Sequence, residues 1–139
     1  MLDLYLRHIV GWSMSAEMTA QFVIDALMMA LWRRGKSATL MHHSDQGSHY
    51  TSEEFQRLLA DHGVKCLMSR TGNCWDNAVA ESFCSSLKIE RVSRKTYWTR
   101  DEAKADVFDY IERFYNPKRR HSTIGHVRPI AFEEKMALA

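Results

Sequence analysis

Hydrophobic residues recur at helical spacing in four segments of the chain, at about residues 15–34, 51–62, 76–91 and 99–116. Ser15 is a plausible N-cap for the first segment, and Gly35 follows it as a stop signal. Capping boxes, in which a glutamate follows a threonine by three residues, open the second and fourth segments at Thr51 with Glu54 and Thr99 with Glu102. We therefore predict four helices. Their expected inward residues are Phe22, Val23, Ala26, Leu27, Ala30 and Leu31, then Phe55, Leu58 and Leu59, then Val79, Ala80, Phe83 and Leu87, and finally Ala103, Val107, Ile111 and Phe114.

Short apolar and β-branched runs alternate with these helices. They predict strands at residues 7–14, 39–43 and 64–69. Leu40 and Met41 are expected to face the core from the second of these strands. Because strands alternate with helices along the chain, the pattern indicates an α/β fold.

The composition is that of one ordinary globular domain, with 139 residues of which 45% are hydrophobic and 26% are charged. No apolar stretch approaches the ~20 residues that cross a bilayer, and no targeting segment is visible. We therefore expect a cytoplasmic chain without a membrane partner. Residues 1–115 are expected to form a core domain, on which a basic extension over residues 116–139 packs through Ile130 and Phe132.

The three cysteines, Cys66, Cys74 and Cys84, are odd in number and lack CxxC spacing, which is typical of reduced thiols. No pair of histidines and cysteines has the short spacing of a structural zinc site either. We therefore predict neither a disulfide nor zinc.

The net charge of +2 conceals an uneven distribution along the chain. Residues 1–83 carry 7 basic and 9 acidic side chains, whereas residues 84–139 carry 12 and 8. The densest basic run is Lys118-Arg-Arg-His121. Such a run is often only a solvated surface, but a basic half next to an acidic half also fits a polyanionic partner.

Asp45 and Glu81 are the carboxylates in the most informative context. Asp45 follows a predicted interior strand, at the sheet edge where α/β proteins usually bind ligands, and the nearby Gly47 allows close backbone approach. Glu81 shares a polar helix stripe with Asn77, Ser85 and Lys88. The interval between them is weak evidence, because the same interval separates two carboxylates with ordinary structural roles, Asp76 as a helix N-cap and Glu112 in mid-helix.

Carboxylates from a strand end and a flanking helix can hold Mg²⁺ together, since this cation prefers oxygen ligands. Two such ions about 4 Å apart can assist an in-line displacement at a phosphodiester. Lys88 would then lie near a phosphate backbone. The alternative is that Asp45 is a surface loop residue and Glu81 a solvated helix residue.

Two long strings and the ending of the chain are the most specific features. They are His43-Ser-Asp-Gln-Gly-Ser-His-Tyr-Thr-Ser52, Ser69-Arg-Thr-Gly-Asn-Cys-Trp-Asp-Asn-Ala-Val-Ala-Glu-Ser-Phe83, and Tyr115-Asn-Pro-Lys-Arg-Arg-His-Ser122 with Gly125 and Pro129. Together they closely resemble the integrase-core transposases of bacterial two-frame insertion sequences, which are relatives of retroviral integrases. The resemblance extends over essentially the whole chain.

This resemblance implies a ribonuclease-H-like integrase catalytic core, a triad of two aspartates and one glutamate that binds Mg²⁺ or Mn²⁺, and cleavage and strand transfer of DNA. Asp45 matches the second aspartate and Glu81 the glutamate, while Lys88 falls where such integrases carry a lysine near the DNA end. The residues expected to shape the site are Gln46, Gly47 and Asn77. The residues expected to contact DNA phosphates are Lys118, Arg119, Arg120 and His121, although they could instead position the tail against the catalytic helix.

The resemblance departs from the family pattern at the start of the chain. Asp3 matches an aspartate at the far end of the second strand and not the first catalytic one, and Leu6 stands where a serine is usual. We therefore expect a C-terminal part of a transposase, incomplete at the first strand and the first catalytic Asp, and inactive alone in strand transfer.

The expected partners are DNA, as insertion-sequence ends and target, and a second copy or intact transposase. The alternative function is a non-catalytic remnant that binds DNA or oligomerises with intact transposase. A free-standing ribonuclease-H-type nuclease fits less well, because the ending of the chain follows the transposase pattern.

Overall fold

The computed structural model describes residues 1–35, 41–44, 50–68 and 74–138. The chain divides into two compact units. The first unit comprises Met1 and Val10–Asp76, and the second comprises Leu2–Ile9 and Asn77–Ala139.

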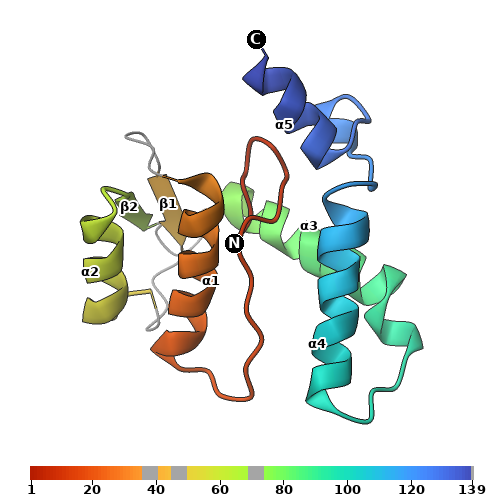
Figure 1. Ribbon diagram of the computed structural model, residues 1–139, viewed down its shortest axis with the longest axis horizontal. Helices are drawn as coiled ribbons and strands as arrows, with labels where there is room; N and C mark the ends of the chain where they lie inside the picture. The colour runs from red at the N-terminus through yellow and green to blue at the C-terminus, as the bar shows by residue number, and fades with distance from the viewer. Residues whose placement is uncertain (36–40, 45–49, 69–73, 139) are drawn as a thin grey trace. The chain divides into compact units, whose positions relative to one another are not determined.

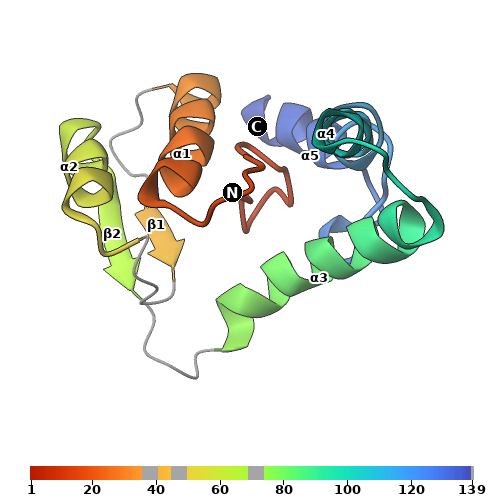
Figure 2. The same ribbon diagram turned by 90° about the horizontal axis from the view of Figure 1, so that it is seen from below.

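The first unit contains two parallel strands and two helices. The strands β1 (Met41–Ser44) and β2 (Lys65–Met68) pair in register, with His42 opposite Cys66. The helices α1 (Ala20–Arg34) and α2 (Glu53–Asp61) lie side by side over one face of these strands (Figure 1, Figure 2). A parallel pair covered by helices is compatible with the expected ribonuclease-H-like fold, and β2 confirms the strand predicted at residues 64–69.

The core of the first unit forms between α1 and α2. Leu27 of α1 is buried with Phe55 and Leu59 of α2, which are 0% and 1% exposed. His42 of β1 points toward these helices, because its ring centroid lies 5.2 Å from that of Phe55. Its neighbour Met41 is therefore on the other face and is 56% exposed, so the prediction that Met41 faces the core is wrong. Leu40 lies outside the described residues.

Both helices of the first unit begin later than predicted. The first helix starts at Ala20 after the N-cap Thr19, because the Ser15 hydroxyl instead accepts the Glu17 N–H in a local turn. The second helix is capped by Ser52, whose hydroxyl accepts the Phe55 N–H at 3.3 Å, and not by Thr51. The two expected caps at Ser15 and Thr51 are therefore wrong, although both helices exist.

Two positions in the first unit require glycine, one at the end of α2 and one where the backbone approaches α1 closely. Gly63 has φ +68° and follows α2, where the N–H of Gly63 bonds to Ala60 and that of Val64 to Leu59, so the helix ends as predicted. Gly11 packs against the backbone of α1. A Cβ at this position would lie 2.1 Å from the carbonyl oxygen of Ala26, which only glycine avoids.

No strand forms over residues 7–14, so this prediction is wrong. Residues 2–9 instead form a tight loop, in which Leu2 pairs with Ile9 and the Asp3 carboxylate accepts the N–H groups of two turn residues. The N–H and carbonyl of Ile9 bond to the side chain of Asn116 at 2.9 and 3.0 Å. A side chain thus satisfies the backbone groups that a neighbouring strand would have paired.

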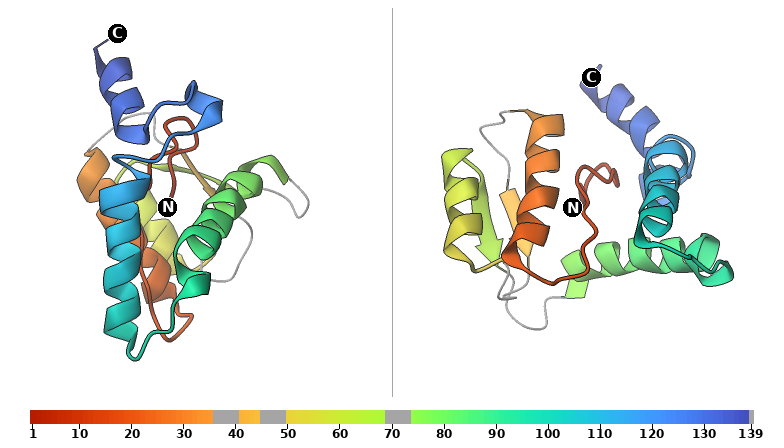
Figure 3. Two further views of the ribbon diagram at one scale, coloured as in Figure 1. Left: turned by 90° about the vertical axis from the view of Figure 1, so that its right-hand side faces the viewer. Right: turned by 60° about the horizontal axis from the view of Figure 1, so that its bottom comes forward.

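The second unit is helical in the part that the structure describes (Figure 3). Its long helix α3 (Cys74–Glu90) is followed by the 3₁₀ turn η1 (Val92–Arg94) and by α4 (Arg100–Asp109). The Thr99 hydroxyl accepts the Glu102 N–H at 3.1 Å, which confirms the predicted cap of α4. The remaining elements are the π-helical turn η2 (Tyr110–Tyr115), the 3₁₀ turn η3 (Ser122–Ile124) and the helix α5 (Pro129–Ala137).

The π-helical turn changes which residues face the core of the second unit. The Asn116 N–H bonds to the Ile111 carbonyl five residues back, so η2 contains one residue more than an α-turn. Tyr110, Tyr115 and Asn116 are consequently buried together with Ile111, whereas Phe114 is only half-buried. The uniform helical spacing predicts Ile111 and Phe114 as inward but does not mark the buried Tyr110 and Asn116.

The C-terminal residues pack within the second unit. The Ile130 N–H bonds to the Asn116 carbonyl at 3.2 Å, Pro129 is fully buried, and the ring of Phe132 lies 5.6 Å from that of Tyr5. The boundary predicted at residues 115 and 116 stays a prediction. In the described ranges, no helix has both the length and the apolar character needed to cross a membrane.

Candidate functional site

Three of the predicted site residues, Asp45, Gln46 and Gly47, lie outside the described residues. They directly follow Ser44, the last residue of β1. Asn77 belongs to the first turns of α3, but its side chain is likewise outside the description. Their roles in metal binding and in shaping the site stay predictions.

Glu81 lies on the exposed side of α3, where Ser85 and Lys88 are also exposed. Its carboxylate makes no hydrogen bond or ion pair with any residue that the structure describes. The predicted polar stripe therefore exists at these three positions. The opposite side of the helix is half-buried at Val79 and Phe83.

Two predictions about α3 are wrong. Ala80 is exposed, although the helical pattern placed it inward. The helix begins at Cys74, so Asp76 lies inside its first turn and is not the N-cap.

Glu90, at the end of the same helix, is bound to the tail of the chain. It accepts hydrogen bonds from the Arg119 guanidinium at 3.0 and 3.1 Å and from the Tyr110 hydroxyl at 2.7 Å. Burial acts to raise the pKa of Glu90, but these bonds outweigh it and lower the pKa. Glu90 is therefore a structural anion, whereas the Glu81 carboxylate has no partner among the described residues.

Arg119 is held by more than this ion pair. Its guanidinium also donates to the Ser86 hydroxyl at 3.1 Å and lies 5.7 Å from the ring centroid of Tyr115. These contacts fix the segment after η2 to α3, which supports the alternative that this residue positions the tail. Lys118 and Arg120, in contrast, are exposed.

His121 is half-buried next to Tyr115, with the two ring centroids 4.9 Å apart. Burial lowers the pKa of His121 to about 4, and the positive charges of Arg119 and Arg7 act in the same direction. The imidazole is therefore neutral near pH 7. Its Nε2 atom is buried and finds no hydrogen-bond partner among the described residues.

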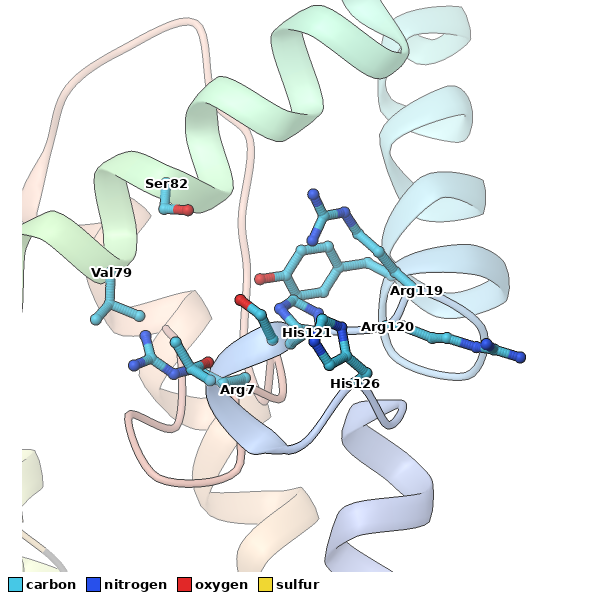
Figure 4. A pocket seen from close by; sticks show the side chains of 10 residues that line it. Arg7, Val79, Ser82, Arg119, Arg120, His121 and His126 are labelled. Carbon is cyan, nitrogen blue, oxygen red and sulfur yellow. The ribbon is translucent and has the colours of Figure 1, made fainter.

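A pocket of about 380 Å³ opens beside this histidine (Figure 4). Its lining includes Arg7 and His126, neither of which the sequence marked, together with the predicted residues Arg119, Arg120 and His121. Arg7 and His126 lie in turns at opposite ends of the chain, and no helical or strand period links them. Only the fold brings them together.

An adjacent pocket of about 500 Å³ shares Arg120 and His126 with the first and is also lined by Lys118 and Arg128. Among the described residues, neither pocket has an aspartate or glutamate in its lining. We call the two together the basic pockets.

The described residues contain no cluster of three or more histidine, cysteine or acidic side chains that could hold a metal ion. Of the two predicted metal ligands, only Glu81 lies among the described residues. An exposed carboxylate without a partner in the described part of the chain fits a hard cation such as Mg²⁺. The fit therefore rests on the chemistry of Glu81 and on the position of Asp45 directly after β1.

Comparison with known proteins agrees with these features. Two family models, each described as an integrase core domain, match the chain, one over residues 1–74 and the other over residues 62–129. Transposase InsF for insertion sequence IS3A of Escherichia coli (strain K12) is 46% identical over 134 residues, which cover 96% of this chain and 46% of that protein. The insertion element IS600 uncharacterized 31 kDa protein of Shigella sonnei is 44% identical over 133 residues, covering 96% and 49% respectively.

The chain spans about half the length of the curated relatives it matches. The resemblance found in the three sequence strings is thus confirmed along nearly the whole chain. The chain belongs to the integrase core domain family, in the type found in insertion-sequence transposases.

Proposed function

We propose that this chain contributes to metal-dependent cleavage and strand transfer of DNA during transposition of an insertion sequence. The similarity to insertion-sequence transposases over 96% of the chain is the observation that carries this proposal. The DNA partners are the ends of the element and the target.

Asp45 and Glu81 are the proposed metal ligands, with Mg²⁺ or Mn²⁺ as the ion. When bound, the metal makes a nucleophilic oxygen more reactive and stabilises the charge on the leaving oxygen. The exposed carboxylate of Glu81, which has no partner among the described residues, supports this role, as does the exposed Lys88 on the same side of α3, which would attract a phosphate. Gln46, Gly47 and Asn77 are proposed to shape the site around the ion.

The metal proposal can be tested by titrating the 139-residue protein with Mn²⁺ and following free ion by electron paramagnetic resonance. We expect Asp45→Asn and Glu81→Gln each to weaken binding about tenfold or more, because each removes one anionic ligand. Glu54→Gln, a matched change at an exposed glutamate of α2, should leave Mn²⁺ affinity unchanged. Equal affinities in all four proteins would exclude the two proposed ligands.

Residues 1–139 contain two of the three carboxylates that the family resemblance implies. We therefore expect the isolated polypeptide to join no DNA strands when incubated with Mg²⁺ and oligonucleotides that carry element ends. Joined product that disappears in the Glu81→Gln variant would contradict this expectation.

A second function, DNA binding or oligomerisation without catalysis, is favoured by the basic pockets, whose described lining residues include no carboxylate. It predicts that the protein binds DNA in EDTA and inhibits strand transfer by an intact relative when added in excess. Undiminished strand transfer in such a mixture would argue against it.

A further inference from the structure

The pocket between α3 and the turn at residues 121–126 is unusually polar for a cavity of its size. Its volume of about 380 Å³ falls in the range of ligand sites, roughly 300–1,000 Å³. Ligand sites are usually lined by apolar groups, yet this one is lined mainly by guanidinium, imidazole and hydroxyl groups, including Ser82 and Thr123. Such a lining suits an anion with several oxygen atoms, since every one of these groups can donate a hydrogen bond.

Two residues in this lining have a strained backbone. Arg7 has φ +58° and His126 has φ +59°, and they are the two non-glycine residues with positive φ in the described part of the chain. This conformation is unfavourable for residues with a Cβ, and strained residues cluster at functional sites. Both of these residues border the same pocket.

Some side chains that line the pocket are bonded to other residues of the protein, and others are available to a ligand. Arg119 is committed to Glu90 and Ser86, so its guanidinium raises the positive potential of the pocket without being released from α3. Arg7 enters from the side opposite to Arg119 (Figure 4), and it makes no ion pair with any described carboxylate. Arg7 and His126 are thus available to a ligand, and the buried Nε2 of His121 offers a further group that lacks a partner in the described chain.

We infer that this pocket binds a phosphodiester of a DNA strand through Arg7 and His126, and that the same strand continues across Arg120 and Lys118 of the adjacent pocket. A single free anion would need one basic pocket, whereas the described residues form two adjacent ones that share His126 and Arg120. Consecutive basic sites match a polymer with regularly repeated phosphates. The identity of the polymer as DNA rests on the proposed function.

The test measures binding of a fluorescein-labelled duplex to the 139-residue protein by anisotropy at pH 7.5 in EDTA, at several salt concentrations. We expect Arg7→Gln to weaken binding about tenfold and to lower the slope of log affinity against log salt by about one. Arg100→Gln removes the same charge at the exposed start of α4, outside both pockets, and should change affinity less than twofold. Equal losses in the two variants would overturn the inference, because they would indicate general charge attraction.

A glycine variant separates binding from folding. His126→Gly removes the imidazole and relieves the positive φ, so the urea midpoint should stay the same or rise while DNA affinity falls at least threefold. Unchanged affinity in this variant would contradict the proposed contact. If Arg7→Gln does not fold by circular dichroism, Arg7→Gly takes its place with the same expected loss of affinity.

Inorganic phosphate serves as the second probe. We expect it to compete with the duplex only at concentrations where chloride of equal ionic strength competes as well. Competition by phosphate at micromolar concentration would show a small-anion site and overturn the assignment to a DNA strand. Because these measurements use EDTA, their failure is independent of whether Asp45 and Glu81 bind metal.

Discussion

Arg119 forms a two-point ion pair with Glu90, in which Nη2 and Nε both lie within 3.1 Å of the same carboxylate oxygen. The pair joins the basic tail to the end of α3. Charge-assisted bonds of this kind exceed the strength of ordinary surface ion pairs because the Arg119 side chain is only 26% exposed. Arg119, which composition alone places in a basic run suited to DNA, thus links the residues after η2 to α3.

This ion pair predicts non-additive mutational effects. Arg119→Ala should lower the free energy of unfolding by about 2 kcal/mol, and Glu90→Gln by a similar amount. In the double variant the losses should overlap, with a coupling energy of about 1 kcal/mol from urea unfolding. Arg120→Ala is the matched control at an exposed neighbour and should change stability by less than about 0.5 kcal/mol. Strictly additive losses would mean that the pair does not contribute.

Asn116 predicts a large effect of a small change. Its side chain is buried, with the whole residue 1% exposed, and it both accepts from and donates to the backbone of Ile9. Asn116→Leu should cost about 3 kcal/mol of unfolding free energy, because it leaves two buried backbone groups unpaired. Gln21→Leu, which removes an exposed side-chain hydrogen bond of α1, should have little effect in the same urea titration. A neutral Asn116→Leu variant would contradict the assigned role.

Gly11 and Gly125 provide a matched pair of glycine substitutions. Gly11→Ala places a methyl group against the backbone of α1 and should lower stability by about 2–3 kcal/mol. Gly125→Ala meets no atom within 4 Å and should cost only about 1 kcal/mol, which reflects its φ of +76°. The melting temperature of the Gly11→Ala variant should therefore be lower than that of the Gly125→Ala variant. The reverse order would mean that the space next to α1 is not tight.

His121 predicts a pH dependence of stability. Its pKa is about 4 in the folded protein against an ordinary value of 6.5, so between these values the unfolded chain binds a proton that the folded chain excludes. Stability should therefore fall as the pH is lowered from 6.5 to 4. The change of the urea midpoint between pH 7 and pH 5 should be smaller in His121→Asn than in the unmodified protein. His62→Asn, at an exposed histidine, should retain the full change.

Features that depend on neighbouring residues could be predicted from the sequence. The four helices, the strand β2, the cap of α4 at Thr99 and the stop at Gly63 all follow from local spacing and turn chemistry. The exposed Glu81 also lies on the predicted polar stripe. The family could be identified for a different reason. The sequence strings at residues 43–52 and 69–83 are long and therefore specific.

Features that depend on distant residues could not be predicted. Residues 7–14 have the composition of a strand, but their backbone groups are satisfied by Asn116 and by a local turn. The one-residue expansion in η2 leaves no mark in the hydrophobic pattern, so the buried Tyr110 and Asn116 are not among the inward residues that this pattern predicts. Arg7 and His126 could not be connected before the fold placed them at one pocket.

The bonds between Ile9 and Asn116 have a consequence for the order of folding. They join residues 107 positions apart, so closing this contact costs more chain entropy than any helix of the same unit. During synthesis, residues 2–9 leave the ribosome long before Asn116 does. The contact between Ile9 and Asn116 therefore cannot form until Asn116 has been synthesised, and ribosome-bound chains that end before Asn116 should expose residues 2–9 to proteases.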